Sequence, residues 1–261
     1  MTSAALSSFL LALLLVGSVL MALRLQASGL HRQYPIFFLY FVFRIPNSLW
    51  PLFVDVRTNT YFLIFVFTMP VVLVFYVLLV RELYKLVLED YRGLQTAGRW
   101  AMYASLVGAV AVAILTLIPK IQPSMPQRSQ AIGYLLVSER GIDTALAMFI
   151  FLLLALLSRY PIHLRRNVRI HAVVYSVFFL SSTMAILART ILGMKSLSTL
   201  NTIGSVINVC CMFAWLILLR PAGEKAPARQ VKAAGESERR LLLQLEGINA
   251  ALLRVGRPKV G

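Results

Sequence analysis

The run Tyr61–Val80, YFLIFVFTMPVVLVFYVLLV, is 20 residues long and carries no charged side chain. A helix needs about 20 consecutive apolar residues to cross the hydrocarbon core of a bilayer, so this run predicts a membrane-spanning helix. The backbone groups of such a segment have no water to bond to, and only a helix pairs them all within the segment. The alternating pattern of a membrane β-barrel does not occur along the chain.

The composition of the whole chain supports the same class. Of its 261 residues, 59% are hydrophobic and 14% are charged, whereas a soluble domain is typically about 45–50% apolar and about 25% charged. A water-soluble domain, a disordered chain and a disulfide-stapled secreted fold are therefore excluded as the default. The two cysteines, Cys210 and Cys211, are adjacent in an apolar run, and we interpret them as small buried hydrophobic residues.

Six further apolar runs flank the first one, and together they predict an all-α integral membrane protein with a seven-transmembrane-helix bundle over residues 1–220. The expected spans are Ala4–Leu23, Ile36–Val54, Tyr61–Val80, Trp100–Ile118, Thr144–Leu157, Ala172–Leu187 and Thr202–Leu219. The fifth span can extend back toward Ala131. The first is expected to be a true span, because a signal peptide would begin with basic residues and this one does not.

The distribution of basic residues predicts the orientation. Lys and Arg collect in cytoplasmic loops, and an outside N-terminus with a cytoplasmic C-terminus places 19 of the 26 on the inner side. Six lie on the outer side, and Arg44 lies inside the second span. Without the tail, the loops still favour this orientation by 10 to 6. We expect the protein in the inner, or plasma, membrane, where it contacts membrane lipids.

The C-terminal tail divides into two parts. Residues 221–236 are rich in Ala, Lys and Gly and predict a flexible linker, and residues 237–256 predict a cytoplasmic amphipathic helix. Its apolar positions follow a two-heptad spacing: Leu241, Leu245, Ile248, Leu252 and Val255. Two readings remain open, namely a helix that lies on the bilayer or on the cytoplasmic loops, and a helix that contacts a partner protein or a second copy.

Motifs of common enzyme and cofactor sites do not occur in this chain. It has no phosphate-binding glycine loop and no G-x-S-x-G motif. The three histidines, His31, His163 and His171, fall at predicted cytoplasmic edges, and none has a histidine or carboxylate one helical turn away within a span. We therefore expect no enzyme, no metal, no cofactor and no nucleic-acid partner.

A charged residue inside a predicted span is the most informative feature. Arg44 lies near the middle of the second span, where a charge costs at least about 2.5–3.5 kcal/mol unless it is paired or reaches the interface. Pro46 and Pro51 follow it and are expected to kink or open the helix. The candidate polar cluster comprises Arg44, Asp55, Glu139, Arg140, Asp143 and Arg189. It is read either as an ion pair between Arg44 and Glu139 or Asp143 that locks the bundle, or as an outward-facing pocket for a small ligand or an ion path.

Two weaker patterns accompany this cluster. Asn201, Ser205 and Asn208 form a polar stripe on one face of the seventh span, which predicts interhelical hydrogen bonds or, less favourably, a pore lining. The basic stretch Arg159–Arg169 is interpreted as a topology signal or as a binding site for anionic lipid headgroups.

Three stretches resemble a family of uncharacterised bacterial seven-transmembrane-helix integral membrane proteins. They are His31–Tyr40 (HRQYPIFFLY), Ser138-Glu139-Arg140, and Leu245–Leu252 (LEGINAAL). A tryptophan usually precedes the tail asparagine in that family, whereas Ile248 stands there in this chain. The resemblance implies seven helices, an outside N-terminus and Glu139-Arg140 within a helix, and no activity is known for that family.

These observations lead to one preferred hypothesis about function. We expect a non-enzymatic, receptor-like or sensory protein with a polar cluster in its outer half and a partner-binding tail. The alternative is a structural or accessory subunit of a larger membrane complex. A transporter or channel is less favoured, because the inner halves of the spans are apolar and inverted repeats are not evident.

Overall fold

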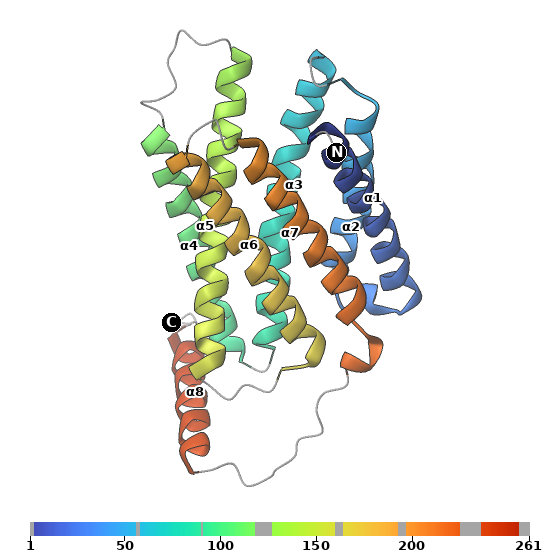
Figure 1. Ribbon diagram of the computed structural model, residues 1–261. Helices are drawn as coiled ribbons and strands as arrows, with labels where there is room; N and C mark the ends of the chain where they lie inside the picture. Colours follow the sequence, from blue (N-terminus) through green and yellow to red (C-terminus); the bar gives the residue numbers. More distant parts are fainter. Residues whose placement is uncertain are drawn as a thin grey trace, which may run out of the picture.

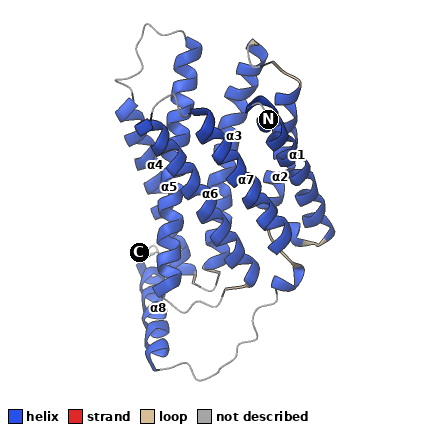
Figure 2. Ribbon diagram, viewed as in Figure 1, coloured by secondary structure: helices blue, strands red, loops and turns tan. Residues whose placement is uncertain are grey.

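The structure is a computed structural model that describes residues 3–55, 58–89, 91–117, 127–159, 164–192, 197–224 and 236–255. Nearly all of these residues are helical, and none lies in a strand (Figure 2). The α-helices are α1 (Ser3–Ala27), α2 (Pro35–Leu49), α3 (Asn59–Val87), α4 (Arg92–Leu117), α5 (Gln127–Arg159), α6 (Arg166–Leu192), α7 (Leu197–Leu218) and α8 (Glu236–Val255). Short 3₁₀ turns, η1 (Leu30–Arg32), η2 (Trp50–Leu52) and η5 (Pro221–Glu224), follow α1, α2 and α7.

Helices α1 to α7 lie side by side in one bundle (Figure 1). Neighbouring pairs run in the order α2–α1–α7–α6–α5–α4, and α3 packs against α2, α4, α5 and α6. Helix α8 packs against α4 at the lower end of this bundle (Figure 1). Because α3 touches four other helices, its side chains are placed to join both halves of the bundle.

Four helices are long and apolar enough to cross a membrane, which indicates a membrane protein. Among the described residues these segments are Ser8–Ala27, Asn59–Val87, Arg166–Ala185 and Thr199–Leu218. Large apolar side chains also face outward from the bundle, including Phe67 of α3, Val107 of α4 and Phe151 of α5. In water such a surface would be unfavourable, whereas lipid chains solvate it.

Two helix boundaries differ from the sequence prediction in an informative way. Helix α2 ends at Leu49 and continues only as the 3₁₀ turn η2, which is shorter than the predicted span to Val54. Pro51 lacks a backbone N–H group and so cannot continue the helical hydrogen bonds, whereas Pro46 lies inside α2. Helix α5 instead begins at Gln127, so the expectation that Glu139 and Arg140 lie within the fifth helix is confirmed.

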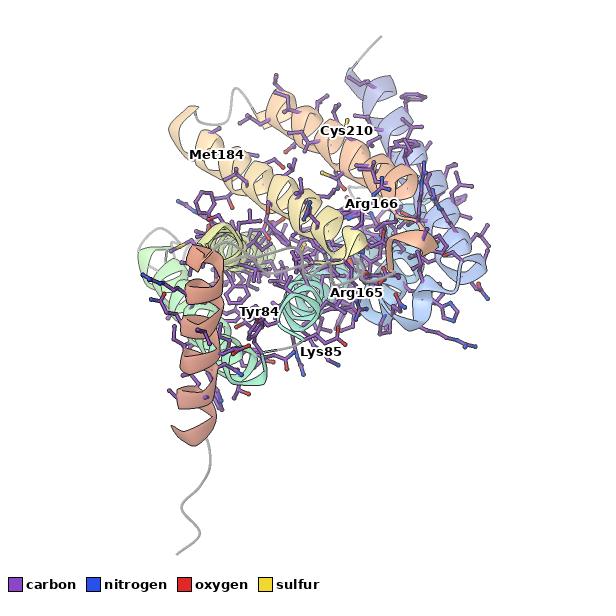
Figure 3. The ribbon with its side chains drawn as sticks, turned by 90° about the horizontal axis from the view of Figure 1, so that it is seen from below. Tyr84, Lys85, Arg165, Arg166, Met184 and Cys210 are labelled. Atoms are coloured by element: carbon purple, nitrogen blue, oxygen red, sulfur yellow. The ribbon has the colours of Figure 1, made fainter. Side chains whose placement is uncertain are left out.

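A close contact between α3 and α4 depends on a glycine. The buried Tyr84 of α3 donates its hydroxyl hydrogen to the Leu94 carbonyl oxygen of α4 at 2.7 Å (Tyr84 is labelled in Figure 3). A Cβ atom at Gly98, one turn further along α4, would lie 1.6 Å from the Tyr84 hydroxyl oxygen. Only a glycine at this position lets the tyrosine ring reach α4.

We therefore predict opposite effects for two alanine substitutions in α4. Gly98→Ala should lower the free energy of unfolding by about 1–3 kcal/mol, because the tyrosine ring must move and its hydrogen bond is lost. Gly108→Ala should leave it unchanged or raise it by up to about 1 kcal/mol, since no atom lies within 4 Å of the added Cβ. Unfolding in detergent measures both values, and equal stability of the two variants would contradict the contact.

Candidate functional site

Arg44 is buried within the bundle and is held by two neutral side chains. It is 8% exposed. Its Nη1 donates to the Tyr40 hydroxyl oxygen at 2.7 Å, and its Nη2 donates to the Asn208 Oδ1 of α7 at 2.9 Å. The guanidinium carbon also lies 5.6 Å from the centre of the Tyr40 ring, within the range of a cation–π contact. The cation therefore joins α2 to α7.

Asp143 of α5 is buried in the same bundle and has a different partner. It is 1% exposed, and its Oδ2 accepts a hydrogen bond of 2.5 Å from the Ser182 hydroxyl of α6. Its Oδ1 has no hydrogen-bond partner among the described residues. A buried oxygen without a partner is costly, so this carboxyl group is a candidate for contact with a bound species.

Tyr76 of α3 is close enough to both groups to interact electrostatically with Arg44 and Asp143. Its ring centre lies 6.1 Å from that of Tyr40 and 5.4 Å from that of Phe178. Six polar side chains on five helices thus form what we call the polar centre: Tyr40, Arg44, Tyr76, Asp143, Ser182 and Asn208.

The structure brings together only part of the cluster that the sequence predicted. The expected ion pair between Arg44 and Glu139 or Asp143 is not among the ion pairs of the described residues, because α7 supplies a neutral acceptor instead. Glu139 and Arg140 are half-buried in α5. Asp55 is exposed beyond η2, where its carbonyl oxygen accepts from Thr58. Arg189 lies in α6, and its side chain is outside the described part of the chain.

The structure also brings only part of the predicted polar stripe of α7 to Arg44. Asn208 reaches Arg44, Ser205 is half-buried one turn earlier, and Asn201 is exposed toward the start of the helix. Asn208 thus belongs to the polar centre.

A second polar group at the opposite end of α2 was not anticipated from the sequence. Glu82 of α3 is buried, and its carboxyl oxygens accept hydrogen bonds from the backbone N–H groups of Ile36 at 3.0 Å and Phe37 at 3.1 Å. These are free donors in the first turn of α2. One signal was available, because α2 begins at Pro35 after Tyr34, and tyrosine is not a usual N-cap residue. A helix start without its own acceptor needs one from elsewhere.

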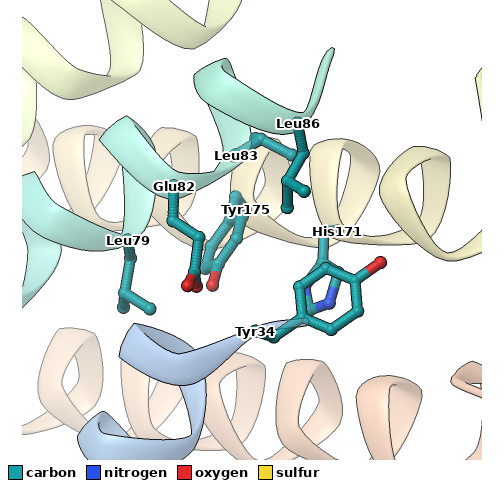
Figure 4. Close-up of a pocket in the computed structure, with 7 residues that line it drawn as sticks. All are labelled: Tyr34, Leu79, Glu82, Leu83, Leu86, His171 and Tyr175. Atoms are coloured by element: carbon teal, nitrogen blue, oxygen red, sulfur yellow. The ribbon is translucent and has the colours of Figure 1, made fainter. Parts of the chain in front are cut away.

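Glu82 also lines a narrow crevice, whose residues are shown in Figure 4. The lining consists of Tyr34, Leu79, Glu82, Leu83, Leu86, His171 and Tyr175. The crevice has no room for a water molecule. It is therefore a packed seam between α3, α6 and the start of α2.

His171 is the most deeply buried polar residue of this seam. It is 1% exposed, and neither ring nitrogen has a hydrogen-bond partner among the described residues. Its ring centre lies 4.6 Å from those of Tyr34 and Phe37 and 5.7 Å from that of Tyr175. The sequence had placed His171 at a cytoplasmic edge, and the structure adds that aromatic rings enclose it.

The hydroxyl of Tyr34 connects the crevice to the beginning of the tail. It donates to Glu224 Oε1 of η5 at 2.6 Å, and the same oxygen accepts from Asn167 Nδ2 at 2.5 Å. Arg165 lies 3.7 Å from Glu224 Oε2 and 2.6 Å from Glu89 (Arg165 is labelled in Figure 3). Burial and the hydrogen bond to Glu224 raise the pKa of the Tyr34 hydroxyl well above its usual range, so Tyr34 stays a neutral donor.

No protein-family model, curated protein or solved structure matches this chain. Within the described residues there is also no group of three or more His, Cys, Asp or Glu side chains that could hold a metal ion.

We predict strong coupling between Arg44 and Asn208. In a double-mutant cycle with Arg44→Met and Asn208→Leu, the coupling free energy should be about 1.5–3 kcal/mol, the range for a hydrogen bond to a charged group. The same cycle with Asp143→Asn should give a smaller coupling, because Asp143 bonds to Ser182. Unfolding in detergent supplies the values. A larger coupling with Asp143 than with Asn208 would restore the ion pair that the sequence suggested.

We also predict that Glu82 holds the start of α2. Glu82→Leu should lower the free energy of unfolding by about 2–4 kcal/mol, because two buried N–H groups lose their acceptor. Glu82→Gln should cost less, since the amide keeps one acceptor oxygen. The neighbouring exposed Arg81→Gln serves as the control and should change stability by no more than about 0.5 kcal/mol. A Glu82→Leu variant as stable as this control would disprove the capping role.

Proposed function

We propose that this chain is a non-enzymatic, receptor-like or sensory protein of the bacterial inner membrane, in which α1 to α7 all cross the bilayer. The N-terminus lies outside and the tail inside. Helix α2 is the shortest of the seven, but Pro35–Leu49 with η2 spans about 28 Å at the usual rises per residue. This is close to the 30 Å of the hydrocarbon core. The excess of basic residues on one side supports the orientation.

The polar centre is the observation that supports a receptor. Arg44 carries a positive charge within the apolar bundle, and its two hydrogen-bond partners are neutral. A charge at this depth is costly and, in membrane proteins, usually marks a functional site. A small anionic ligand that paired with the guanidinium would reduce that cost. The ligand class that fits best is therefore a small anion.

The helices that hold Arg44 also lead to the tail. Arg44 belongs to α2, whose first turn is capped by Glu82, and Asn208 belongs to α7, which continues into η5 and Glu224. Tyr34, directly before α2, bonds to Glu224. A shift of α2 against α7 at Arg44 would thus be transmitted to the beginning of the tail, as a sensory role requires.

Native mass spectrometry of the full chain, purified in mild detergent, tests this proposal. A bound small anion should be present on the wild type, absent from Arg44→Gln and retained by Arg140→Gln, the matched arginine on α5. Retention of the anion by Arg44→Gln would place the site elsewhere. A stoichiometric protein partner kept by the wild type and by both variants, without a small anion, would favour the accessory-subunit alternative.

The orientation yields a separate prediction. In a Cys210→Ala/Cys211→Ala background, a cysteine at Ser3 should react with a membrane-impermeant maleimide on spheroplasts, and a cysteine at Ser237 should react only after lysis. The reverse pattern would invert the assignment. Labelling at both positions in sealed spheroplasts would show that the number of crossings is even.

A further inference from the structure

Helix α8 packs against the beginning of α4. The Asn249 side-chain oxygen Oδ1 accepts hydrogen bonds from the backbone N–H groups of Gly93 at 2.6 Å and Leu94 at 3.3 Å. These are donors in the first turn of α4, which have no partner within their own helix. Three residues later, Leu252 is half-buried against the core of the bundle. Asn249 thus acts as the N-cap of a helix that lies 155 residues away in the chain.

The surface of α4 against which α8 packs depends on a glycine, Gly93. A Cβ atom at position 93 would lie 2.4 Å from the Asn249 carbonyl oxygen and 2.8 Å from its Oδ1. The first of these atoms is backbone, so α8 itself would have to move to make room. Tyr91, directly before α4, is not a usual N-cap residue. The start of α4 therefore combines free donors with a surface that lets another backbone approach.

Asn249 and Leu252, three residues apart, lie on neighbouring positions of the side of α8 that meets α4. Two other apolar residues of α8 remain outside this contact: Leu243 is 66% exposed and Ile248 is 45% exposed. Figures 1 and 3 show α8 beside α4 at the border of the bundle, away from α1, α2 and α7. A partner that recognised the side of α8 with Asn249 and Leu252 would meet it already occupied.

We propose that the beginning of α4 is a docking site for an amphipathic helix that carries Asn or Asp three residues before Leu. The chain's own α8 fills this site in the structure. Helix α8 and a partner helix of the same chemistry exclude each other, and a protein that binds the side of α8 with Asn249 and Leu252 has to release it from α4. The docking and the exclusion do not depend on the proposed function. The role of that release as a signal passed by the tail rests on the proposed function.

Hydrogen exchange of residues 236–255 in the full chain tests the docking. A released 20-residue helix is marginal in water, so its amides should lose at least tenfold protection in Gly93→Ala and Asn249→Ala. Gly108→Ala, on the same helix with no neighbour near its Cβ, should retain the protection of the wild type. Asn249→Asp should retain it as well, because a carboxylate caps a helix equally well. Equal exchange in Gly93→Ala and Gly108→Ala would overturn the proposal.

Exclusion is tested with a labelled synthetic peptide of residues 236–255 added to the full chain. Its affinity should be at least tenfold higher for the Asn249→Ala chain than for the wild type, because α8 has then left its docking site on α4. The Gly93→Ala/Asn249→Ala chain should not bind it. Equal affinity for wild type and Asn249→Ala would disprove mutual exclusion. Unchanged bundle melting in the Asn249 variants shows that the fold is intact, and neither readout depends on an anion at Arg44, so the two proposals can fail separately.

Discussion

The carboxyl group of Glu82 holds the start of α2, and much of the rest of the structure depends on that position. Its two oxygens bind the first free N–H groups of α2, at Ile36 and Phe37. This contact fixes where α2 begins relative to α3, and a fixed start sets the depth of Arg44 and the placement of Tyr34. Tyr34 in turn packs on His171 and bonds to Glu224. One buried acceptor therefore positions the polar centre on one side and the beginning of the tail on the other.

The same constraint recurs at other helix ends of the bundle. Arg24 of α1 donates to the Leu219 carbonyl oxygen beyond the end of α7 at 2.6 Å, and Asn167 of α6 donates to the Arg220 carbonyl oxygen at 2.8 Å. Asn249 supplies the acceptor at the start of α4. Backbone groups at a helix end must be satisfied wherever water is scarce. Side chains from distant helices meet this need here, and each such contact also ties two helices together.

Arg44 presents the opposite situation, since its charge rather than a backbone group needs compensation. Tyr40 and Asn208 supply oxygen acceptors and a ring face, which replace part of its hydration. These two hydrogen bonds use two of the five N–H donors of the guanidinium group. The small anion that we propose as a ligand would accept hydrogen bonds from the other donors. A hydrophobic bundle without Arg44 would avoid this cost, and its presence supports a role beyond packing.

The sequence by itself determined that the chain forms apolar helices long enough for a membrane, that residue 44 places a charge among them, and that an amphipathic helix forms near the C-terminus. These features are local, because hydropathy and backbone hydrogen bonds within one segment decide them. The tertiary structure alone decided that Arg44 bonds to Asn208, that Glu82 caps α2 and that Asn249 caps α4. Such pairs join residues 45 to 164 positions apart, and their meeting depends on how closely helices pack, as the contacts at Gly93 and Gly98 show. Periodicity along one segment carries no information about which other segment will lie beside it.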